Sequence, residues 1–235
     1  MEIRREHDAA RLIRRRDAML ALGGAGLGAI TLAVPAVRRL ARQALGDGEA
    51  WAADTCELSP EQTEGPYYID GAQLRRNVTE SRPGVPLLVS LEVNDAQSCA
   101  PIPGAVVEIW HADAGGSYSG FNGADNATFM RGSHPVGAAG VATFRTVYPG
   151  WYRGRTVHIH VKVHVDGNEV HTGQLYFDDA LSDTVFAQEP YASRGTRDTR
   201  NANDGIFANG GAASTLTVLP RGKGYWGTKT LVVAT

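Results

Sequence analysis

The chain has 235 residues, of which 43% are hydrophobic and 20% charged. These values are close to those of globular proteins and exclude extensive disorder. Residues 1–53 hold nine Lys/Arg and six Asp/Glu, which leaves 14 Lys/Arg and 19 Asp/Glu, a formal net charge of −5, on residues 54–235. An acidic body argues against nucleic acid as a partner. The 28 glycines indicate many tight turns.

The N-terminal segment has the pattern of an export signal. Arg14–Asp17 precedes an apolar stretch, residues 18–34, that is rich in Gly and Ala and ends before Pro35. This stretch is too short and too glycine-rich for a good membrane span, and its glycines also disfavour a short buried helix. We therefore predict a twin-arginine-type signal and linker over residues 1–53, export to the periplasm or the outside of the cell, and no stable membrane span after processing. The sequence leaves open where the signal is cut and whether it is retained as an anchor.

The chain contains two cysteines, Cys56 and Cys99, and both follow the predicted signal. Two cysteines in an exported protein favour one disulfide in an oxidising compartment. Two unpaired buried thiols are the alternative, and the separation in sequence does not decide between them.

Residues 54–235 show the pattern of a single all-β domain. Short runs with apolar residues at every second position are separated by Gly, Pro, Asn and Asp, which predicts an antiparallel β-sandwich with long loops and little helix. Asp166-Gly167 suits a tight hairpin, residues 180–186 a short helix, and residues 195–209 a surface loop. The predicted strands cover residues 87–93, 105–110, 140–146, 157–165, 173–177, 215–219 and 228–233.

Two histidines in one predicted strand form a candidate metal site. In residues 156–164, valine and isoleucine alternate with polar side chains, so Val157 and Ile159 face the core while His158 and His160 share the opposite face. Same-face residues two apart lie about 7 Å apart, which lets two imidazoles reach one ion. The alternative is a solvent-facing polar stripe, of which His164 is a further member.

Two tyrosines on predicted turns are candidates for the remaining ligands. Tyr118 follows Gly115-Gly116-Ser117, and Tyr152 follows Pro149-Gly150-Trp151. A phenolate binds well only to a strongly Lewis-acidic ion, which favours Fe(III) over Zn(II) or Fe(II). Taken singly, each tyrosine suits equally a half-buried aromatic side chain with its hydroxyl on water or backbone.

Seven motifs, taken together and in order, resemble the intradiol ring-cleavage dioxygenases, the family that includes protocatechuate 3,4-dioxygenase and catechol 1,2-dioxygenase. The resemblance runs from about Cys56 to Phe207 and implies a prealbumin-like β-sandwich that holds one mononuclear non-haem Fe(III) per chain. The exported, protocatechuate-like members are the closer analogues, because a long N-terminal helical domain is lacking. The motifs are Thr63–Tyr68, Gly104–Trp110, Gly116–Tyr118, Pro149–Tyr152, Arg155–His160, Gln174–Phe177 and Asp204–Phe207.

The resemblance assigns a role to each candidate residue. Tyr118 and His158 correspond to equatorial iron ligands and Tyr152 and His160 to axial ones, with Tyr152 also a base once substrate displaces it. Arg155 corresponds to the arginine that stabilises negative charge on the ring, and Gln174 to a glutamine behind the ligands. A surface arginine and an ordinary strand glutamine are the alternatives. The remaining assignments are pocket residues, namely Tyr67, Tyr68 and Trp151, and a turn residue, Asp204.

The resemblance implies a small aromatic diol and O2 as partners, and ring cleavage between the two hydroxylated carbons to a cis,cis-muconate-type product. Only residues 153–157 separate Tyr152 from His158, which predicts a more open pocket than in members with a longer insertion there. Two other readings remain: a catalytically silent sandwich that binds carbohydrate or protein, and a zinc hydrolase that uses the two histidines. The sequence decides neither the catechol that is cleaved nor whether the chain forms homo-oligomers.

Overall fold

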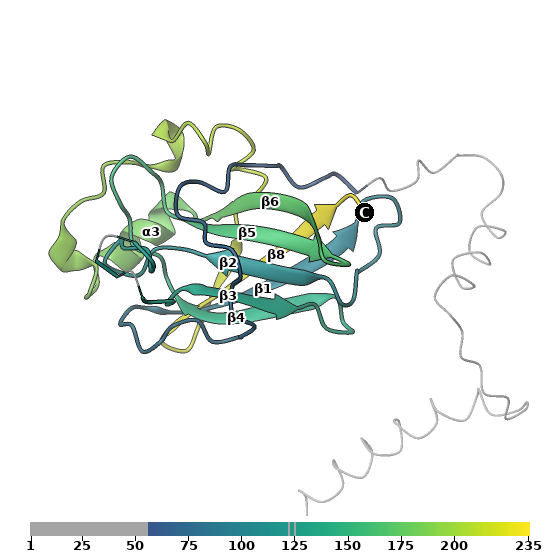
Figure 1. Cartoon of the computed structure of the whole chain (residues 1–235). Helices are drawn as coiled ribbons and strands as arrows, with labels where there is room; N and C mark the ends of the chain where they lie inside the picture. The colour runs from purple at the N-terminus through teal and green to yellow at the C-terminus, as the bar shows by residue number, and fades with distance from the viewer. Residues whose placement is uncertain (1–55, 122, 125) are drawn as a thin grey trace, which may run out of the picture. The chain divides into compact units, whose positions relative to one another are not determined.

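The computed structural model describes residues 56–121, 123–124 and 126–235, so the predicted signal segment lies outside the described residues (Figure 1). The described chain contains eight strands in two four-stranded sheets, one α-helix and two short 3-10 helices, Ala192–Arg194 and Asn201–Asn203. The prediction of an all-β sandwich with little helix is confirmed. Among these residues no helix has the length and apolar character needed to cross a membrane.

The first sheet, which we call sheet A, carries most of the motifs. It has the order β3-β2-β5-β6, and all of its neighbours run antiparallel. Its strands are β2 (Val106–Trp110), β3 (Arg131–Pro135), β5 (His158–Val165) and β6 (Asn168–Tyr176). The predicted hairpin joins β5 to β6, because Asp166 and Gly167 both adopt positive φ and so form a two-residue turn that matches the strand twist.

The second sheet, sheet B, has the order β4-β1-β8-β7. Its strands are β1 (Pro86–Asp95), β4 (Val141–Val147), β7 (Thr217–Arg221) and β8 (Gly224–Val233). Here the antiparallel prediction is wrong for one pair, because β1 and β8 run parallel. Alternation of apolar residues identifies a strand but not its direction, and strands so far apart in sequence can pair either way.

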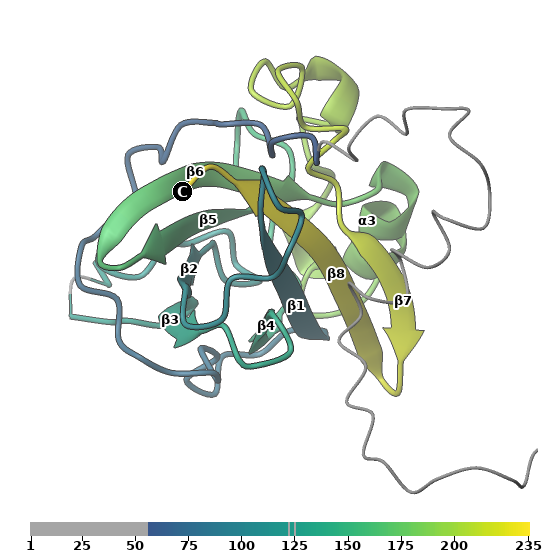
Figure 2. The ribbon, with the colours of Figure 1, turned by 90° about the vertical axis from the view of Figure 1, so that its right-hand side faces the viewer.

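The inner faces of the two sheets meet in one core (Figure 2). Val89 and Leu91 of β1 pack in the same cluster as Ile109 of β2 and Val161 of β5, and all four are fully buried. The predicted core-facing residues of β5 are therefore confirmed. Burial of this apolar face stabilises the fold by about 25 cal/mol for each Å² removed from water.

Outside the sheets, the chain between β6 and β7 forms α3 (Asp179–Phe186) and then the long loop. Asp178 caps α3 by accepting hydrogen bonds from the amides of Ala180 and Leu181. The predicted short helix is confirmed and begins one residue earlier than expected.

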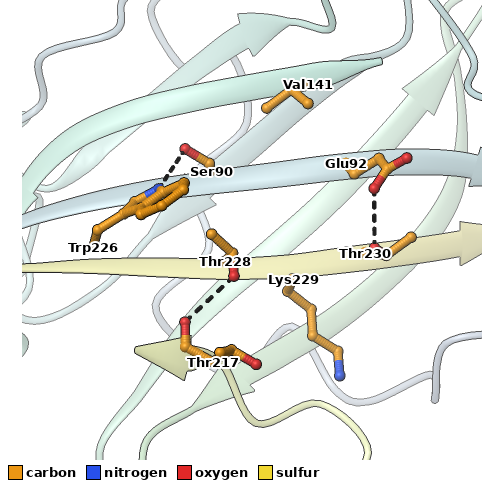
Figure 3. Close-up of a pocket in the computed structure, with 8 residues that line it drawn as sticks. All are labelled: Ser90, Glu92, Val141, Thr217, Trp226, Thr228, Lys229 and Thr230. Atoms are coloured by element: carbon orange, nitrogen blue, oxygen red, sulfur yellow. Dashed lines mark hydrogen bonds between the residues drawn. The ribbon is translucent and has the colours of Figure 1, made fainter. Parts of the chain in front are cut away.

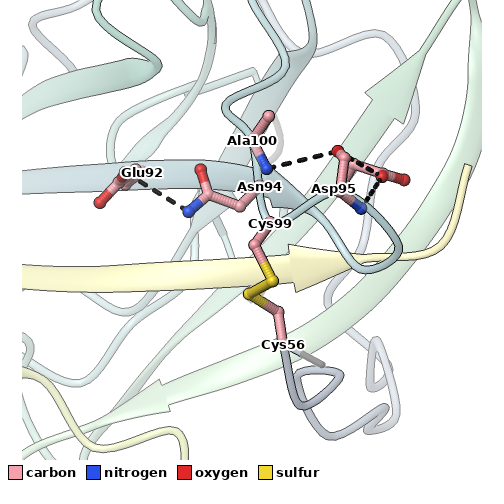
Figure 4. The surroundings of a disulfide bond; sticks show 7 residues. Cys56, Glu92, Asn94, Asp95, Cys99 and Ala100 are labelled. Atoms are coloured by element: carbon pink, nitrogen blue, oxygen red, sulfur yellow. Dashed lines mark hydrogen bonds between the residues drawn. A yellow bond between two sulfur atoms is a disulfide. The ribbon is translucent and has the colours of Figure 1, made fainter. Parts of the chain in front are cut away.

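The segment of residues 56–74, which we call the strap, runs along sheet A to the outer face of β5 (Figure 1). Cys56 is joined to Cys99 by a disulfide (Figure 4), which confirms the disulfide prediction. The amide of Ser59 donates to Val232 at 2.9 Å, and that of Gln62 donates to Thr172 at 2.9 Å. The strap is therefore fastened at its beginning and along its length.

Reduction of this disulfide is expected to destabilise the domain. The bond closes a loop with a sequence separation of 43, for which loss of chain entropy in the unfolded state predicts about 4 kcal/mol, an upper estimate for a real protein. Urea unfolding with and without reductant measures the effect. The Cys56→Ser/Cys99→Ser variant should match the reduced protein and ignore reductant, and equal stability of oxidised and reduced protein would contradict the prediction.

Candidate active site

The candidate site lies on the outer face of sheet A, beneath the strap. His158 and His160 are 3% and 1% exposed, so the polar face of β5 is not a solvent-facing stripe. The strap covers it, and a Cβ added at Gly65 would lie 3.2 Å from the His160 ring. A larger residue than glycine at this positive-φ position would crowd the imidazole.

Four side chains bring donor atoms to one point. The Nε2 atoms of His158 and His160 lie 3.1 Å apart. The hydroxyl oxygens of Tyr118 and Tyr152 lie 3.4 Å and 3.2 Å from His158 Nε2. Ligands that each lie about 2.1 Å from a single ion are separated by roughly 3 to 3.6 Å. We call these residues the quartet, and their spacing fits one metal ion.

The two imidazoles are held in the form that binds a cation. His158 Nδ1 lies 2.6 Å from the carbonyl oxygen of Thr156, so this nitrogen carries the proton and Nε2 presents its lone pair to the quartet. Burial lowers the pKa of His158 to about 3 and that of His160 well below its ordinary value. Both rings are therefore neutral at physiological pH.

The two phenols are protonated unless a cation replaces the proton. Burial raises the pKa of Tyr118 well above 10, and burial also raises the pKa of Tyr152. Only a strongly Lewis-acidic ion offsets that cost. Within the described chain, no cluster of three or more His, Cys, Asp or Glu side chains is arranged to hold a metal ion. The donor set of the quartet is two phenols and two imidazoles.

Loops at the end of the sandwich hold the two tyrosines. Gly116 has a φ of +79°, and a Cβ there would lie 2.3 Å from the Trp151 carbonyl oxygen, so only glycine lets the two loops approach. The guanidinium of Arg131 donates to the Ser119 carbonyl at 2.8 Å, which fixes the backbone next to Tyr118. Tyr118 is buried, whereas Tyr152 is half-buried, so Tyr152 has more room to move.

Arg155 and Gln174 contact each other, which the sequence analysis did not predict. The Arg155 guanidinium donates to Gln174 Oε1 at 2.6 Å and, through Nε, to Asp204 at 2.8 Å. Its side chain is 16% exposed, so the surface-arginine alternative is wrong. Gln174 in turn donates to the Thr63 carbonyl of the strap at 2.8 Å.

Asp204 does more than the sequence indicates. One carboxylate oxygen accepts from the amides of Ile206 and Phe207, which confirms the turn, and the other accepts from Thr156 N at 2.7 Å as well as from Arg155. Burial on its own raises the pKa of Asp204. The hydrogen bonds from Phe207 and Thr156 and the charge of Arg155 outweigh this effect, so the pKa lies below its ordinary value. The loop between α3 and β7 thus reaches back to position the arginine.

Aromatic rings surround the quartet. Tyr67 stacks on Tyr118 with centroids 4.4 Å apart and meets Tyr152 edge-on at 6.1 Å. Trp110, directly opposite His160 in the sheet, stacks on that imidazole at 4.8 Å. Tyr68 packs against Trp110, with ring centroids 5.0 Å apart. Tyr67 therefore contacts two members of the quartet, whereas Tyr68 contacts Trp110.

Trp151 lies in different surroundings from the two strap tyrosines. It packs against the main core, and the guanidinium of Arg194 lies 4.6 Å from its ring. Its assignment to substrate binding stays a prediction. The sequence did not predict two supporting contacts. These are the stacking of the buried Trp110 on His160 and the contact of Asp204 with Arg155 and Thr156. The alternation of β2 and β5 could have placed Trp110 on the histidine face, whereas nothing local indicates where Asp204 reaches.

A polar cluster follows the quartet along β5. Lys162 forms ion pairs with Glu64 at 2.8 Å and Glu169 at 2.7 Å, and lies 4.0 Å from the centroid of the Tyr68 ring. Glu108 of β2, opposite Lys162 in the sheet, is 6% exposed. Burial raises the pKa of Glu108 to about 7, against the attraction of Lys162.

The raised pKa of Glu108 predicts a pH-dependent stability. Its carboxyl takes up a proton more readily in the folded state than in the unfolded state, where the pKa is about 4.5. Stability should therefore fall as the pH rises through about 7. Glu108→Gln should flatten this dependence and stabilise the protein at pH 8 by roughly 1–2 kcal/mol. Chemical unfolding from pH 5 to 9 tests it, with the exposed Glu57→Gln as control, and an unchanged pH profile would contradict it.

The chain is similar to known dioxygenases. The profile of the family described as Dioxygenase matches residues 63–204. A chlorocatechol 1,2-dioxygenase from Cupriavidus pinatubonensis is 31% identical over an alignment of 150 residues, which covers 55% of this chain and 58% of the relative. A catechol 1,2-dioxygenase from Acinetobacter lwoffii is 36% identical over 101 residues, 40% of this chain and 32% of the relative. The chain thus spans less than two thirds of these relatives.

Two solved structures cover more of the chain. An intradiol ring-cleavage dioxygenase from Tetranychus urticae is 37% identical, with a TM-score of 0.73 over 76% of this chain and 95% of that one. The dioxygenase domain of a dioxygenase carbohydrate-binding protein fusion from Streptomyces sp. SirexAA-E is 36% identical, with a TM-score of 0.61 over 76% of this chain and 99% of that one. The family profile covers more than half of the chain and includes all four residues of the quartet. The chain belongs to the intradiol ring-cleavage dioxygenase family.

Proposed function

We propose that this protein cleaves the ring of a catechol-type diol between its two hydroxylated carbons, with O2, to a cis,cis-muconate-type product. The observation that carries the proposal is the quartet, in which the two phenol oxygens and His160 Nε2 each lie 3.1 to 3.4 Å from His158 Nε2. The donor chemistry supports Fe(III), because two phenolates bind best to a hard trivalent cation. Bound there, Fe(III) would supply the Lewis acidity that holds a catecholate by both oxygens and activates its ring.

Three side chains of the protein would assist the reaction: a base, a positively charged group and an aromatic ring that borders the site. Tyr152 is the less buried phenol, so its oxygen, as the phenolate that a bound cation would favour, is placed to leave the quartet and to accept a proton from the incoming diol. The Arg155 guanidinium, fixed by Asp204 and Gln174, is suited to stabilise negative charge that develops on the ring. Tyr67, stacked on Tyr118, closes one side of the site and limits access of water.

Oxygen uptake by the iron-loaded protein tests the proposal. Catechol, protocatechuate, hydroxyquinol and chlorocatechols form the panel, and one or more should be consumed at one O2 per ring with the spectrum of a muconate-type product. The protein should be burgundy, and its phenolate-to-iron absorption band should shift on addition of substrate. Colourless protein at full iron occupancy, zinc at full occupancy as purified, or product from cleavage outside the two hydroxyls would overturn the proposal.

The cell location remains a proposal as well. A twin-arginine-type signal over residues 1–53 would export the folded, metal-loaded protein, and a single disulfide between Cys56 and Cys99 supports an oxidising destination. Fractionation of expressing cells tests this, and replacement of Arg14, Arg15 and Arg16 by Lys should retain the protein in the cytoplasm. Unchanged export of that variant would contradict a twin-arginine route.

A further inference from the structure

The outer face of sheet B, on the far side of the sandwich from the quartet, carries an exposed row of side chains. In the strand register, Arg145 of β4 lies opposite Leu88 of β1, Leu88 opposite Trp226 of β8, and Trp226 opposite Leu219 of β7. Trp226 and Leu219 are 37% and 53% exposed. On β1, β4 and β8 the neighbours of this row are buried or half-buried, so the row is the outward half of the alternation, whereas on the edge strand β7 Pro220 is exposed as well.

The next row of the same face consists of hydroxyl groups. Ser90 lies opposite Thr143 and Thr228, and Thr228 lies opposite Thr217. Together with Trp226 these residues lie in or beside a depression of about 520 Å³ (Figure 3). The indole Nε1 donates to Ser90 Oγ at 3.0 Å, which holds the ring over β1 (Figure 3). The face thus presents a fixed aromatic ring beside groups that donate and accept hydrogen bonds.

A second depression, of about 610 Å³, adjoins the first and is cationic. It shares the row of Leu88 and Arg145, and its lining contains four arginines and no carboxylate. Arg82 has an ion pair with Asp113 at 3.4 Å. Within the described part of the chain, the three others have no carboxylate partner, in a domain that is acidic as a whole. The four are Arg76, Arg82, Arg145 and Arg221.

The carboxylate of this face lies away from the arginines. Glu92 is four residues along β1 from Leu88, about 13 Å in an extended strand, and accepts a hydrogen bond from Thr230 at 3.2 Å (Figure 3). The face therefore runs from a cationic end, through a tryptophan and a band of hydroxyls, to an end where Glu92 and Lys229 both line the first depression. A sugar ring that carries a carboxylate matches the cationic end and the tryptophan, because its carboxylate can lie beside the arginines while the ring and its hydroxyls lie beside Trp226.

We propose that the outer face of sheet B binds an anionic polysaccharide whose sugar rings carry carboxylates. A sugar ring has an apolar C–H face that packs on Trp226, and hydroxyls at its edge that pair with Ser90 and Thr228. Guanidinium groups bind carboxylates in a bidentate geometry, which assigns Arg145 and Arg221 to the acidic groups. This inference does not depend on the proposed ring cleavage, because it uses the other sheet and none of the quartet.

Calorimetric titration with polygalacturonate tests the proposal on the full chain. Two polymers separate its parts: fully methyl-esterified polygalacturonate keeps the rings without the charge, and polyacrylate keeps the charge without the rings. Each should bind at least about tenfold more weakly than polygalacturonate, and added salt should weaken the binding. No binding of polygalacturonate, equal binding of polyacrylate, or equal binding of the neutral ester would overturn the proposal.

Variants locate the site. Trp226→Ala and the Arg145→Gln/Arg221→Gln pair should each lower the affinity for polygalacturonate at least about tenfold, whereas Trp226→Tyr should retain it within a few-fold. Arg153→Gln is the matched control, since Arg153 is also exposed and lies outside the two depressions. Thermal unfolding checks that each variant is folded. Unchanged affinity in Trp226→Ala, or an equal loss in Arg153→Gln, would refute the assignment.

Discussion

Phenylalanine in place of Tyr152 is expected to lower kcat/KM for the proposed catechol cleavage by at least about 100-fold, because it removes a residue that is both a candidate metal ligand and the candidate base. The hydroxyl that is lost lies 3.2 Å from His158 Nε2. The phenolate-to-iron absorption should weaken and shift, since Tyr118 alone would remain as a phenolate ligand. Steady-state oxygen uptake and the visible spectrum of the iron-loaded variant measure both effects.

Tyr68→Phe is the matched control for the colour. The Tyr68 hydroxyl contacts Asp70 at 3.4 Å rather than the quartet, so the absorption band of this variant should equal that of the natural protein. Loss of colour in Tyr68→Phe, or full turnover in Tyr152→Phe, would refute the roles given to these two tyrosines. A catalytically silent binding module would show no colour in any variant.

Asparagine in place of Asp204 is expected to lower both stability and turnover. The carboxylate is 3% exposed and accepts from four donors, including Arg155. An amide nitrogen would face at least one of these donors, and Arg155 would keep its charge without a partner. Breaking a buried ion pair costs about 3–5 kcal/mol. The released guanidinium should lose its orientation, so kcat should fall at least about tenfold.

The stability effect of Asp204→Asn should depend on pH. Because the pKa of Asp204 lies below its ordinary value in the folded state, its contribution to stability is present above about pH 4 and is lost as the pH falls through the folded pKa. Asp204→Asn should lack this loss. The exposed Asp198→Asn, in the same loop, serves as control and should change stability by no more than about 0.5 kcal/mol. Equal unfolding free energies for Asp204→Asn and the natural protein would contradict the argument.

Local patterns in the sequence were sufficient for most strands and for the histidine pair. Alternation reports which face of a strand is apolar, so it located β5 and put His158 beside His160. It missed β3, because Arg131-Gly132-Ser133-His134 has no apolar residue to mark a face. It also could not show that the second face of β5 is buried, since the strap that covers it begins a hundred residues earlier in the chain.

The ligands beyond the histidines needed more than pattern. Tyr118 and Tyr152 stand on glycine-rich turns, where a tyrosine suits many roles, and resemblance to a family singled them out. Asp204 was recognised as a turn residue, but its contact with Arg155 spans 49 positions. Contacts of that range depend on the path of the whole chain, which local propensity does not encode. The outer face of sheet B, proposed to bind a polysaccharide, is a similar case. Its rows of side chains form only when β4, β1, β8 and β7 lie next to one another.

The parallel pairing of β1 with β8 has a consequence for how the domain is made. Leu87 pairs with Tyr225 and Asp95 with Val233. The central pair of sheet B therefore joins the first strand of the described chain to its last strand. During synthesis, one edge of β1 stays unpaired until β8 has been made. Sheet B therefore cannot be completed before then, and loss of β8 would leave β1 and β7 without their common neighbour.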